Sequence, residues 1–171
     1  TEKIFQSICK KLKISKVNFN NHRIDLSKKF NIVSMKTLFE KYLGENIIEL
    51  KESDIRKIAK KNRVDIDKKT DKGKIIEKIF SQIVEPNLIN PTFVIDYPVE
   101  ISPLARYKRK DSSNQYVERF ELFISGVEFA NAFSELNDPE EQKRRLENQS
   151  TLLKKGDNEA HMYDADFIKV L

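Results

Sequence analysis

The sequence contains little cysteine and little glycine, and each shortage excludes a class of site. Its single cysteine, Cys9, cannot form an intramolecular disulfide, and its spacing from Phe5 and Ile8 is that of a packed helical side chain. The four glycines form neither a GxGxxG nor a GxxxxGKS/T pattern, so nucleotide binding by those phosphate loops is excluded. No apolar run approaches the roughly 18 residues of a membrane span. We therefore expect a globular chain with no membrane partner.

The lone cysteine agrees with a reducing, cytoplasmic compartment. The N-terminal residues show neither the apolar region of a secretory signal nor the Arg/Ser-rich character of a transit peptide. We expect the chain to be a piece of a larger protein, because its first and last helical patterns begin and stop abruptly. A targeting peptide would precede Thr1, so an organelle stays open as the alternative compartment.

The composition is that of a folded domain, with 39% hydrophobic and 35% charged residues and a net charge of +5. Six lysines in the segment 34–90 could contact the phosphates of RNA. They lack interleaved aromatic residues and an arginine cluster, which favours a solvated helix face instead. An RNA-binding module built on 34–90 stays open as one alternative function. The six are Lys57, Lys60, Lys61, Lys68, Lys69 and Lys72.

The first ninety residues show mainly helical patterns. A helix is predicted over 1–13 and a short hairpin over 17–26. Three short helices should follow: the first is capped by Ser34 and ended by Gly44. The second is capped by Ser53 and the third runs from 74 to 84.

From residue 91 the pattern turns to strands. An extended segment is predicted over 91–102, followed by a polar loop over 106–116 and a strand pair over 119–135. Asp138 should cap a helix that Gly156 closes, and a last short helix begins near Asp164. The predicted fold class is α+β, with an antiparallel sheet.

The strand pair carries three glutamates seven residues apart, Glu121, Glu128 and Glu135. From position 120 to 142 there is no Lys or Arg, although 32 in 171 residues would place about four in those 23 positions. If Ser125 and Gly126 form a two-residue turn, Phe123 faces Glu128 across the strands. Glu121 and Glu128 then become diagonal neighbours on one face.

Two carboxylates so placed, with no cationic partner expected on either strand, repel each other. Acidic residues on a wet sheet face are the ordinary alternative. A site that tolerates this repulsion is a candidate for a divalent cation, and oxygen ligands completed by water and phosphate suit Mg²⁺ better than zinc.

The second strand continues with an amide, an aromatic ring and a carboxylate at alternate positions, so that all three would lie on one face. Asn131, Phe133 and Glu135 could hold an apolar stem that ends in an ammonium group. Strict alternation, however, directs Glu128 to the opposite face from Asn131. One site can use them all only if a β-bulge between Glu128 and Asn131 resets the register.

At these residues the chain resembles the class II lysine–tRNA ligases. The resemblance is carried by three long phrases: INPTFVIDYPVEISPLAR (89–106), ERFELFISGVEFANAFSELNDPEEQ (118–142) and GDNEAHMYDADFIKVL (156–171). Residues before 89 are similar only loosely. The resemblance implies a fragment of the catalytic domain between motifs 2 and 3, divided into 1–33 after motif 2, a helical insertion 34–90, and 91–171 leading to motif 3.

Members of this family activate lysine with ATP to lysyl-adenylate and transfer it to tRNA(Lys), usually as homodimers. By resemblance, Glu121 and Glu128 hold Mg²⁺ against the ATP phosphates, and Asn131, Phe133 and Glu135 belong to the lysine pocket. Many relatives have Arg at Val127 and Glu at Ala165, positions without an assigned role. The arginines of motifs 2 and 3 are absent, so we assign no catalytic residue and expect this polypeptide alone to be inactive.

Two further alternatives stay open. A synthetase paralogue that transfers lysine to a protein would share the pocket and lack the anticodon-binding barrel. A non-catalytic binding fragment would carry the acidic hairpin as mere surface, within a parent chain without the arginines of motifs 2 and 3.

Overall fold

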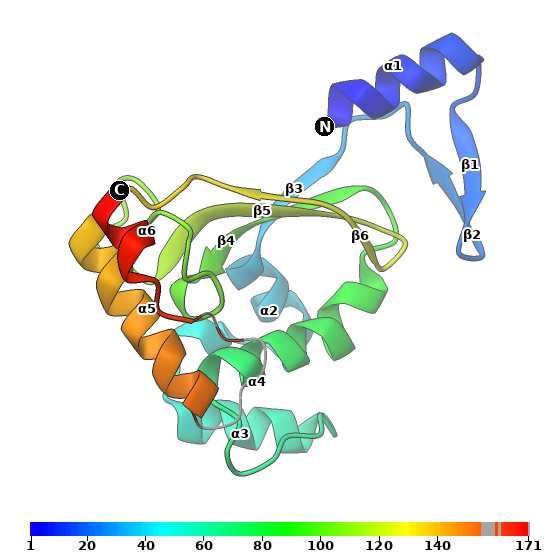
Figure 1. Cartoon of the computed structure of the whole chain (residues 1–171). Coiled ribbons are helices and arrows are strands. Elements are labelled where there is room, and N and C mark those ends of the chain that lie inside the picture. The colour runs from blue at the N-terminus through cyan, green and yellow to red at the C-terminus, as the bar shows by residue number, and fades with distance from the viewer. Residues whose placement is uncertain (155–159, 161, 171) are drawn as a thin grey trace.

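The computed structural model describes residues 1–154, 160 and 162–170 (Figure 1). Within them, no helix is both long and apolar enough to span a membrane. The helices are α1 (Glu2–Leu12), α2 (Met35–Leu43), α3 (Glu52–Lys61), α4 (Lys72–Ile79), α5 (Pro139–Lys154) and α6 (Ala165–Val170). The strands are β1 (Lys16–Phe19), β2 (His22–Asp25), β3 (Asn31–Ser34), β4 (Thr92–Pro98), β5 (Tyr116–Ile124) and β6 (Val127–Phe133).

Four of these strands form one sheet in the order β3-β4-β5-β6, and β1 pairs with β2 in a separate hairpin. The pairs β4–β5 and β5–β6 are antiparallel, as predicted, and the mixed α+β class is confirmed. β3, however, runs parallel to β4. Parallel neighbours need a long crossover connection, which the helices between them provide. β6 lies at the edge of this sheet.

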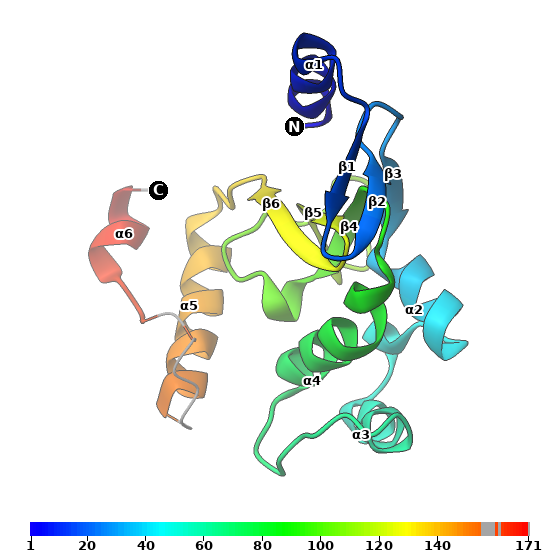
Figure 2. The ribbon, with the colours of Figure 1, turned by 90° about the vertical axis from the view of Figure 1, so that its right-hand side faces the viewer.

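The two faces of the sheet are covered by different parts of the chain. One face, with Val94 and Phe123, packs against α2, α3 and α4 in the larger hydrophobic cluster. The other face, with Leu122 and Ile124, packs against Phe30 and side chains of the N-terminal segment. Figure 2 shows α1 and the β1–β2 hairpin at the opposite end of the molecule from α3. The predicted insertion 34–90 thus shares a core with the sheet, while the proposed three-part division stays a prediction.

The caps of the first two insertion helices differ from each other. The hydroxyl of Ser34 accepts a hydrogen bond from the N–H of Thr37 at 3.1 Å, and Gly44 ends α2 with φ +87°, both as predicted. The predicted cap at Ser53 is wrong. The backbone is already helical at Glu52, so Lys51 occupies the capping position of α3 without a side-chain hydrogen bond.

The third insertion helix begins two residues earlier than predicted. The carboxylate of Asp71 accepts from the N–H of Lys74 at 3.2 Å, which places the start of α4 at Lys72. After α4, a π-helical turn, η2 (Phe80–Val84), and a 3₁₀ turn, η3 (Glu85–Asn87), carry the chain past the expected end at residue 84.

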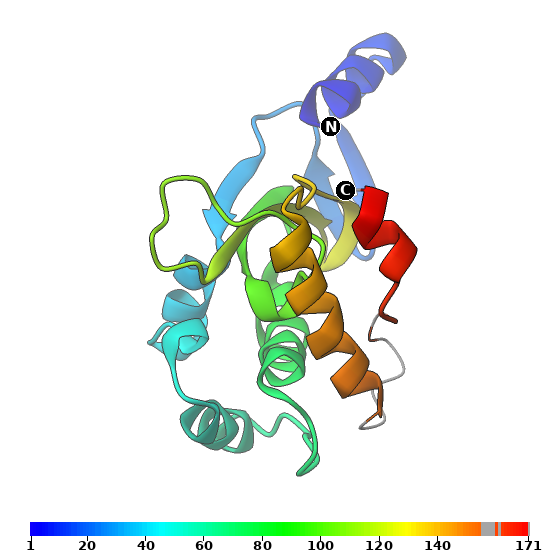
Figure 3. The same ribbon diagram turned by 60° about the vertical axis from the view of Figure 1, so that its left-hand side comes forward.

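The helix after the hairpin begins where the sequence predicted. One carboxylate oxygen of Asp138 accepts from the N–H groups of Glu140 and Glu141 at 3.1 and 3.2 Å. Gly156, predicted to close this helix, lies outside the described residues. Asp164 caps α6 in the same way. α6 lies beside α5 (Figure 3).

The turn between β5 and β6 is held against η3. Backbone N–H groups of Ser125 and Gly126 donate to the carbonyls of Ile89 and Leu88 at 2.9 and 3.1 Å. Gly126 has φ +70°, and a Cβ there would lie 3.3 Å from both the Glu85 carbonyl oxygen and the Pro86 Cα. Both are backbone atoms, so a side chain at this position would be crowded unless the backbone of η3 moves slightly away.

Gly126→Ala should therefore destabilise the fold by more than Gly44→Ala. Both glycines have positive φ, which strains alanine, but nothing lies within 4 Å of a Cβ at Gly44. We expect about 1 kcal/mol of loss for Gly44→Ala and a further loss from crowding for Gly126→Ala. Urea unfolding of both variants measures the difference. Equal losses would show that η3 does not constrain the hairpin turn.

Candidate functional site

One extra residue in β6 decides which side chains of the hairpin share a face. Ser125 and Gly126 form the predicted two-residue turn, both with positive φ. Phe123 pairs with Glu128, but the next pair is Leu122 with Ala130, so the register shifts by one residue. The β-bulge that a shared site would require between Glu128 and Asn131 is therefore present. It leaves Glu128, Asn131 and Phe133 on the face that also carries Glu121.

The extra residue, Phe129, packs away from this face against the N-terminal segment. Its ring lies 5.3 Å from that of Phe19 and 6.4 Å from that of Phe5. The tip of the β1–β2 hairpin also contacts the β5–β6 turn, where Nδ1 of His22 lies 2.7 Å from the hydroxyl of Ser125. These contacts give the bulge a packing partner and so stabilise the shifted register.

Glu121 is buried and bound by three side chains. One carboxylate oxygen accepts from Asn131 Nδ2 at 3.2 Å and from Arg119 Nη2, and the other accepts from the Tyr97 hydroxyl at 2.7 Å. The expectation that neither strand offers a cationic partner is wrong. β5 begins at Tyr116, so Arg119 lies on the strand, two residues before Glu121 and on the same face.

Arg119 is itself held in place from several directions. Its Nη1 donates to the Ile101 carbonyl at 2.8 Å and to the Ser102 hydroxyl at 3.0 Å, and its Nε donates to Asn131 at 3.3 Å. The guanidinium also lies 4.8 Å from the centre of the Tyr97 ring. A buried carboxylate is costly without such a partner, and this network supplies one.

The network leaves Glu121 with limited capacity for a ligand. An ionised carboxylate has about four acceptor positions, and Arg119, Asn131 and Tyr97 occupy three of them. Burial, together with the charge and hydrogen bond of Glu121, raises the pKa of Tyr97, so its hydroxyl remains a donor at neutral pH. One position, on the oxygen that Tyr97 contacts, remains for a cation or a water.

Glu128, by contrast, is an exposed side chain in an unfavourable electrostatic environment. Partial burial and the negative charge of Glu121 raise its pKa, while Arg119 and the Asn131 amide partly offset that rise. Glu85 of η3 experiences the same field, since its pKa is raised by burial and by the charges of Glu121 and Glu128. Sequence reasoning missed Glu85, because only the fold brings η3 to the hairpin.

We call the sheet face that carries Glu121 and Glu128 the acidic face. Its carboxylate oxygens are ligands that suit Mg²⁺. Within the described part of the chain, no group of three or more His, Cys, Asp or Glu side chains could hold a metal ion by itself. Mg²⁺ often binds through one or two carboxylates, with water and substrate phosphates as its other ligands. The free acceptor position of Glu121 and the exposed carboxylate of Glu128 would provide such a pair.

Glu135 lies beyond the end of β6, where the chain is still extended. It forms an isolated antiparallel bridge with Ala105, and the N–H of Leu136 donates to the Leu104 carbonyl at 3.0 Å. Extended backbone through this segment puts Glu135 on the parity of Asn131 and Phe133. Its side chain is exposed and forms no hydrogen bond or ion pair with another side chain among the described residues.

Comparison with known proteins places the amino-acid sequence in a family. The family described as "tRNA synthetases class II (D, K and N)" matches residues 1–171. The lysine–tRNA ligase of Thermoanaerobacter pseudethanolicus is 43% identical over 173 residues and aligns with the whole chain. Those of Moorella thermoacetica and Prochlorococcus marinus are 45% and 46% identical, each over 91% of the chain.

The chain spans about a third of the length of these relatives, between 30% and 34%. The match covers the sheet, the helices of 34–90 and the β5–β6 hairpin, and it confirms the resemblance that the sequence phrases indicated. The chain belongs to the class II tRNA synthetases of the D, K and N family.

Proposed function

We propose that this chain is part of the catalytic domain of a lysine–tRNA ligase, which activates lysine with ATP to lysyl-adenylate and transfers it to tRNA(Lys). The names of the relatives support this activity. The observation that carries the proposal is the bulge at Phe129, since it gathers Glu121, Glu128, Asn131 and Phe133 on one face at the sheet edge. A hairpin in regular register would divide them between two faces.

Within this proposal, Glu121 and Glu128 hold Mg²⁺ against the ATP phosphates. The ion would neutralise phosphate charge and relieve the repulsion that raises the pKa of Glu128. Arg119 would hold the Glu121 carboxylate in its orientation, so that the remaining acceptor position faces the ligand. Arg119 thus acts as a positioning residue for the carboxylate.

Asn131, Phe133 and Glu135 form the proposed lysine pocket. An aromatic ring suits the apolar stem of lysine, and an amide provides polar contact. A carboxylate at the end of the series suits the side-chain ammonium. The exposure of all three residues agrees with a site that binds a ligand at this sheet edge.

The remaining features of the proposal concern the whole protein. Cations that bind the reacting phosphates are needed for this chemistry and would come from motifs 2 and 3, so the 171-residue chain alone should be inactive. The complete enzyme would act as a homodimer in the cytoplasm, or in an organelle. The segments 1–33, 34–90 and 91–171 would follow motif 2, form the insertion and lead to motif 3.

Glu135→Gln tests the pocket in the complete enzyme. Loss of a charge-assisted contact should weaken lysine binding by about 1.5–3 kcal/mol, with ATP affinity nearly unchanged. Isothermal titration calorimetry with each ligand measures both. Glu147→Gln, an exposed change on α5, serves as the control and should alter neither. An equal loss for lysine and ATP would contradict the assignment of Glu135.

Glu128→Gln tests the electrostatic cost of the acidic face. The pKa of Glu128 is raised in the folded chain, so its ionised form opposes folding above that pKa. Without ligands, the variant should be more stable at neutral pH by about 0.5 kcal/mol or less, since the side chain is exposed. The gain should vanish as the pH falls and Glu128 becomes protonated.

Denaturant unfolding between pH 4 and 8 checks this dependence. In the complete enzyme, the same variant should bind Mg²⁺–ATP at least tenfold more weakly. A variant that is less stable than the parent at neutral pH, yet binds Mg²⁺–ATP normally, would remove Glu128 from the site.

A further inference from the structure

The positive charge of the chain is concentrated in one part of the helical insertion. Residues 51–78 contain eleven Lys and Arg and six Asp and Glu, a surplus of five, which equals the net charge of all 171 residues. The rest of the chain is therefore neutral overall. A concentration of this kind creates a local positive potential, which attracts polyanions.

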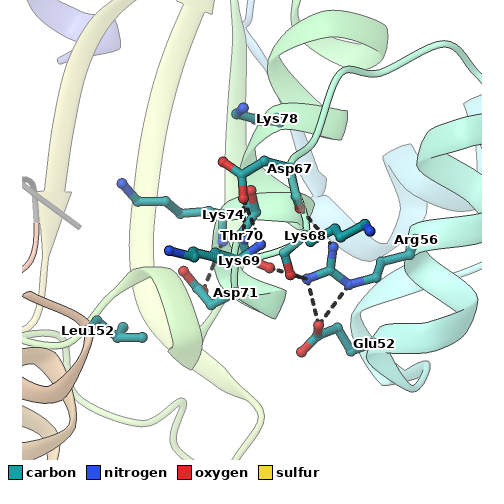
Figure 4. A pocket seen from close by; sticks show the side chains of 10 residues that line it. All are labelled: Glu52, Arg56, Asp67, Lys68, Lys69, Thr70, Asp71, Lys74, Lys78 and Leu152. Carbon is teal, nitrogen blue, oxygen red and sulfur yellow. Dashed lines mark hydrogen bonds and ion pairs between the residues drawn. The ribbon is translucent and has the colours of Figure 1, made fainter. Parts of the chain in front are cut away.

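Within this segment, one loop is held in a fixed conformation by Arg56. Its guanidinium donates to the backbone carbonyls of Asp67 at 3.0 Å and Lys68 at 3.4 Å, and also to that of Thr70 (Figure 4). The Asp67 carboxylate accepts from the N–H groups of Lys69 and Thr70 at 2.7 and 2.9 Å. These contacts use backbone atoms, so the lysine side chains of the loop remain exposed.

We define the basic loop surface as Lys60, Lys68, Lys69 and Lys78. Lys68, Lys69 and Lys78 line a pocket of about 530 Å³, and Lys60 lies one turn after Arg56 on the same face of α3. All four are exposed, and in the described part of the chain none forms an ion pair with a carboxylate. Lys78 donates only to the Asp65 carbonyl, at 3.2 Å.

The acidic side chains in this pocket are engaged elsewhere. Glu52 pairs with Arg56 at 2.8 Å, and Asp71 caps α4. Hydrogen bonds from the Lys69 N–H and from Thr70 lower the pKa of Asp67, so it remains an ionised acceptor for its own loop. The charge of Lys78 also lowers that pKa, so Asp67 attracts Lys78. Lys68 and Lys69 are thus the loop lysines that form no ion pair with a carboxylate in the described part of the chain.

The surroundings distinguish between possible partners. Between Ile32 and Val127, all of which the structure describes, no large hydrophobic side chain is exposed. From outside that range, one apolar residue, the half-buried Leu152, lines the pocket, and the exposed Tyr163 lies beside α5, where its N–H donates to the Ser150 hydroxyl. The lining of the pocket itself is otherwise polar or charged. A membrane-binding surface or a protein docking site would need apolar contacts there. Phosphate groups need only positive charge, and RNA presents them in a row.

We propose that the basic loop surface binds the phosphate backbone of RNA, which under the proposed function is tRNA. Lys68 and Lys69 contact phosphates directly, and Arg56 positions their loop. The contact adds affinity without reading the base sequence. The tRNA identity of the partner rests on the proposed function, whereas the phosphate contact rests on the surface alone.

Fluorescence anisotropy with a tRNA(Lys) transcript tests this contact in the 171-residue chain. Lys68→Ala/Lys69→Ala should lower the slope of log K against log salt by about two, one for each lost phosphate contact. The control is Lys28→Ala/Lys29→Ala, an exposed lysine pair at the other end of the molecule, which should leave the slope unchanged. Equal slopes for all three proteins, no binding at about 50 mM salt, or preference for anionic vesicles over RNA would overturn the proposal.

A second measurement separates this inference from the proposed function. In the complete enzyme, the Lys68/Lys69 double variant should keep lysine-dependent pyrophosphate exchange, while KM for tRNA rises about tenfold. Absence of exchange in the parent enzyme would contradict the proposed function and leave the RNA contact standing. Unchanged KM would overturn the basic loop surface and leave the lysine and ATP site standing.

Discussion

The β5–β6 hairpin contains a β-bulge, because the edge strand β6 has one extra residue, Phe129. The position of this bulge determines which side chains share a face. Side chains alternate along a strand, so a shift of one residue exchanges the two faces. With the bulge, Glu128 joins Asn131 on the face of Glu121, while Phe129 packs against Phe19 on the other side. The N-terminal hairpin thus contributes to the site by filling the space behind it.

The second constraint is electrostatic. Glu121 is buried, and burial of a carboxylate requires a cation or several donors, which Arg119, Tyr97 and Asn131 provide. Glu128 lies on the same face without an equivalent network and has a raised pKa. The two carboxylates therefore differ. Glu121 is already held by hydrogen bonds within the protein, whereas a bound cation would relieve the repulsion that raises the pKa of Glu128. Such a pair suits the proposed site, because Mg²⁺ commonly binds through one or two carboxylates together with water and substrate phosphates.

Local patterns predicted much of this structure, and long-range contacts account for what they missed. The turn at Ser125 and Gly126, the caps at Ser34 and Asp138 and the need for a bulge all follow from neighbouring residues. Arg119 was also within reach of period-two alternation, because the predicted strand pair begins at 119, but Lys and Arg were counted only from position 120. The contact of Tyr97 with Glu121 could not be predicted from alternation, because the register of β4 against β5 shifts beside Asp96, which has φ +59°. Glu85 reaches the site only because η3 packs on the turn.

The central claim is that the acidic face at the sheet edge binds a cation together with a nucleotide. The most direct measurement is anomalous diffraction from crystals of the complete enzyme with ATP and Mn²⁺ in place of Mg²⁺. The account predicts an anomalous peak within ligand distance of carboxylate oxygens of both Glu121 and Glu128, with Arg119 still bonded to Glu121. A peak elsewhere, or none beside a bound ATP while Glu128 faces solvent, would contradict it.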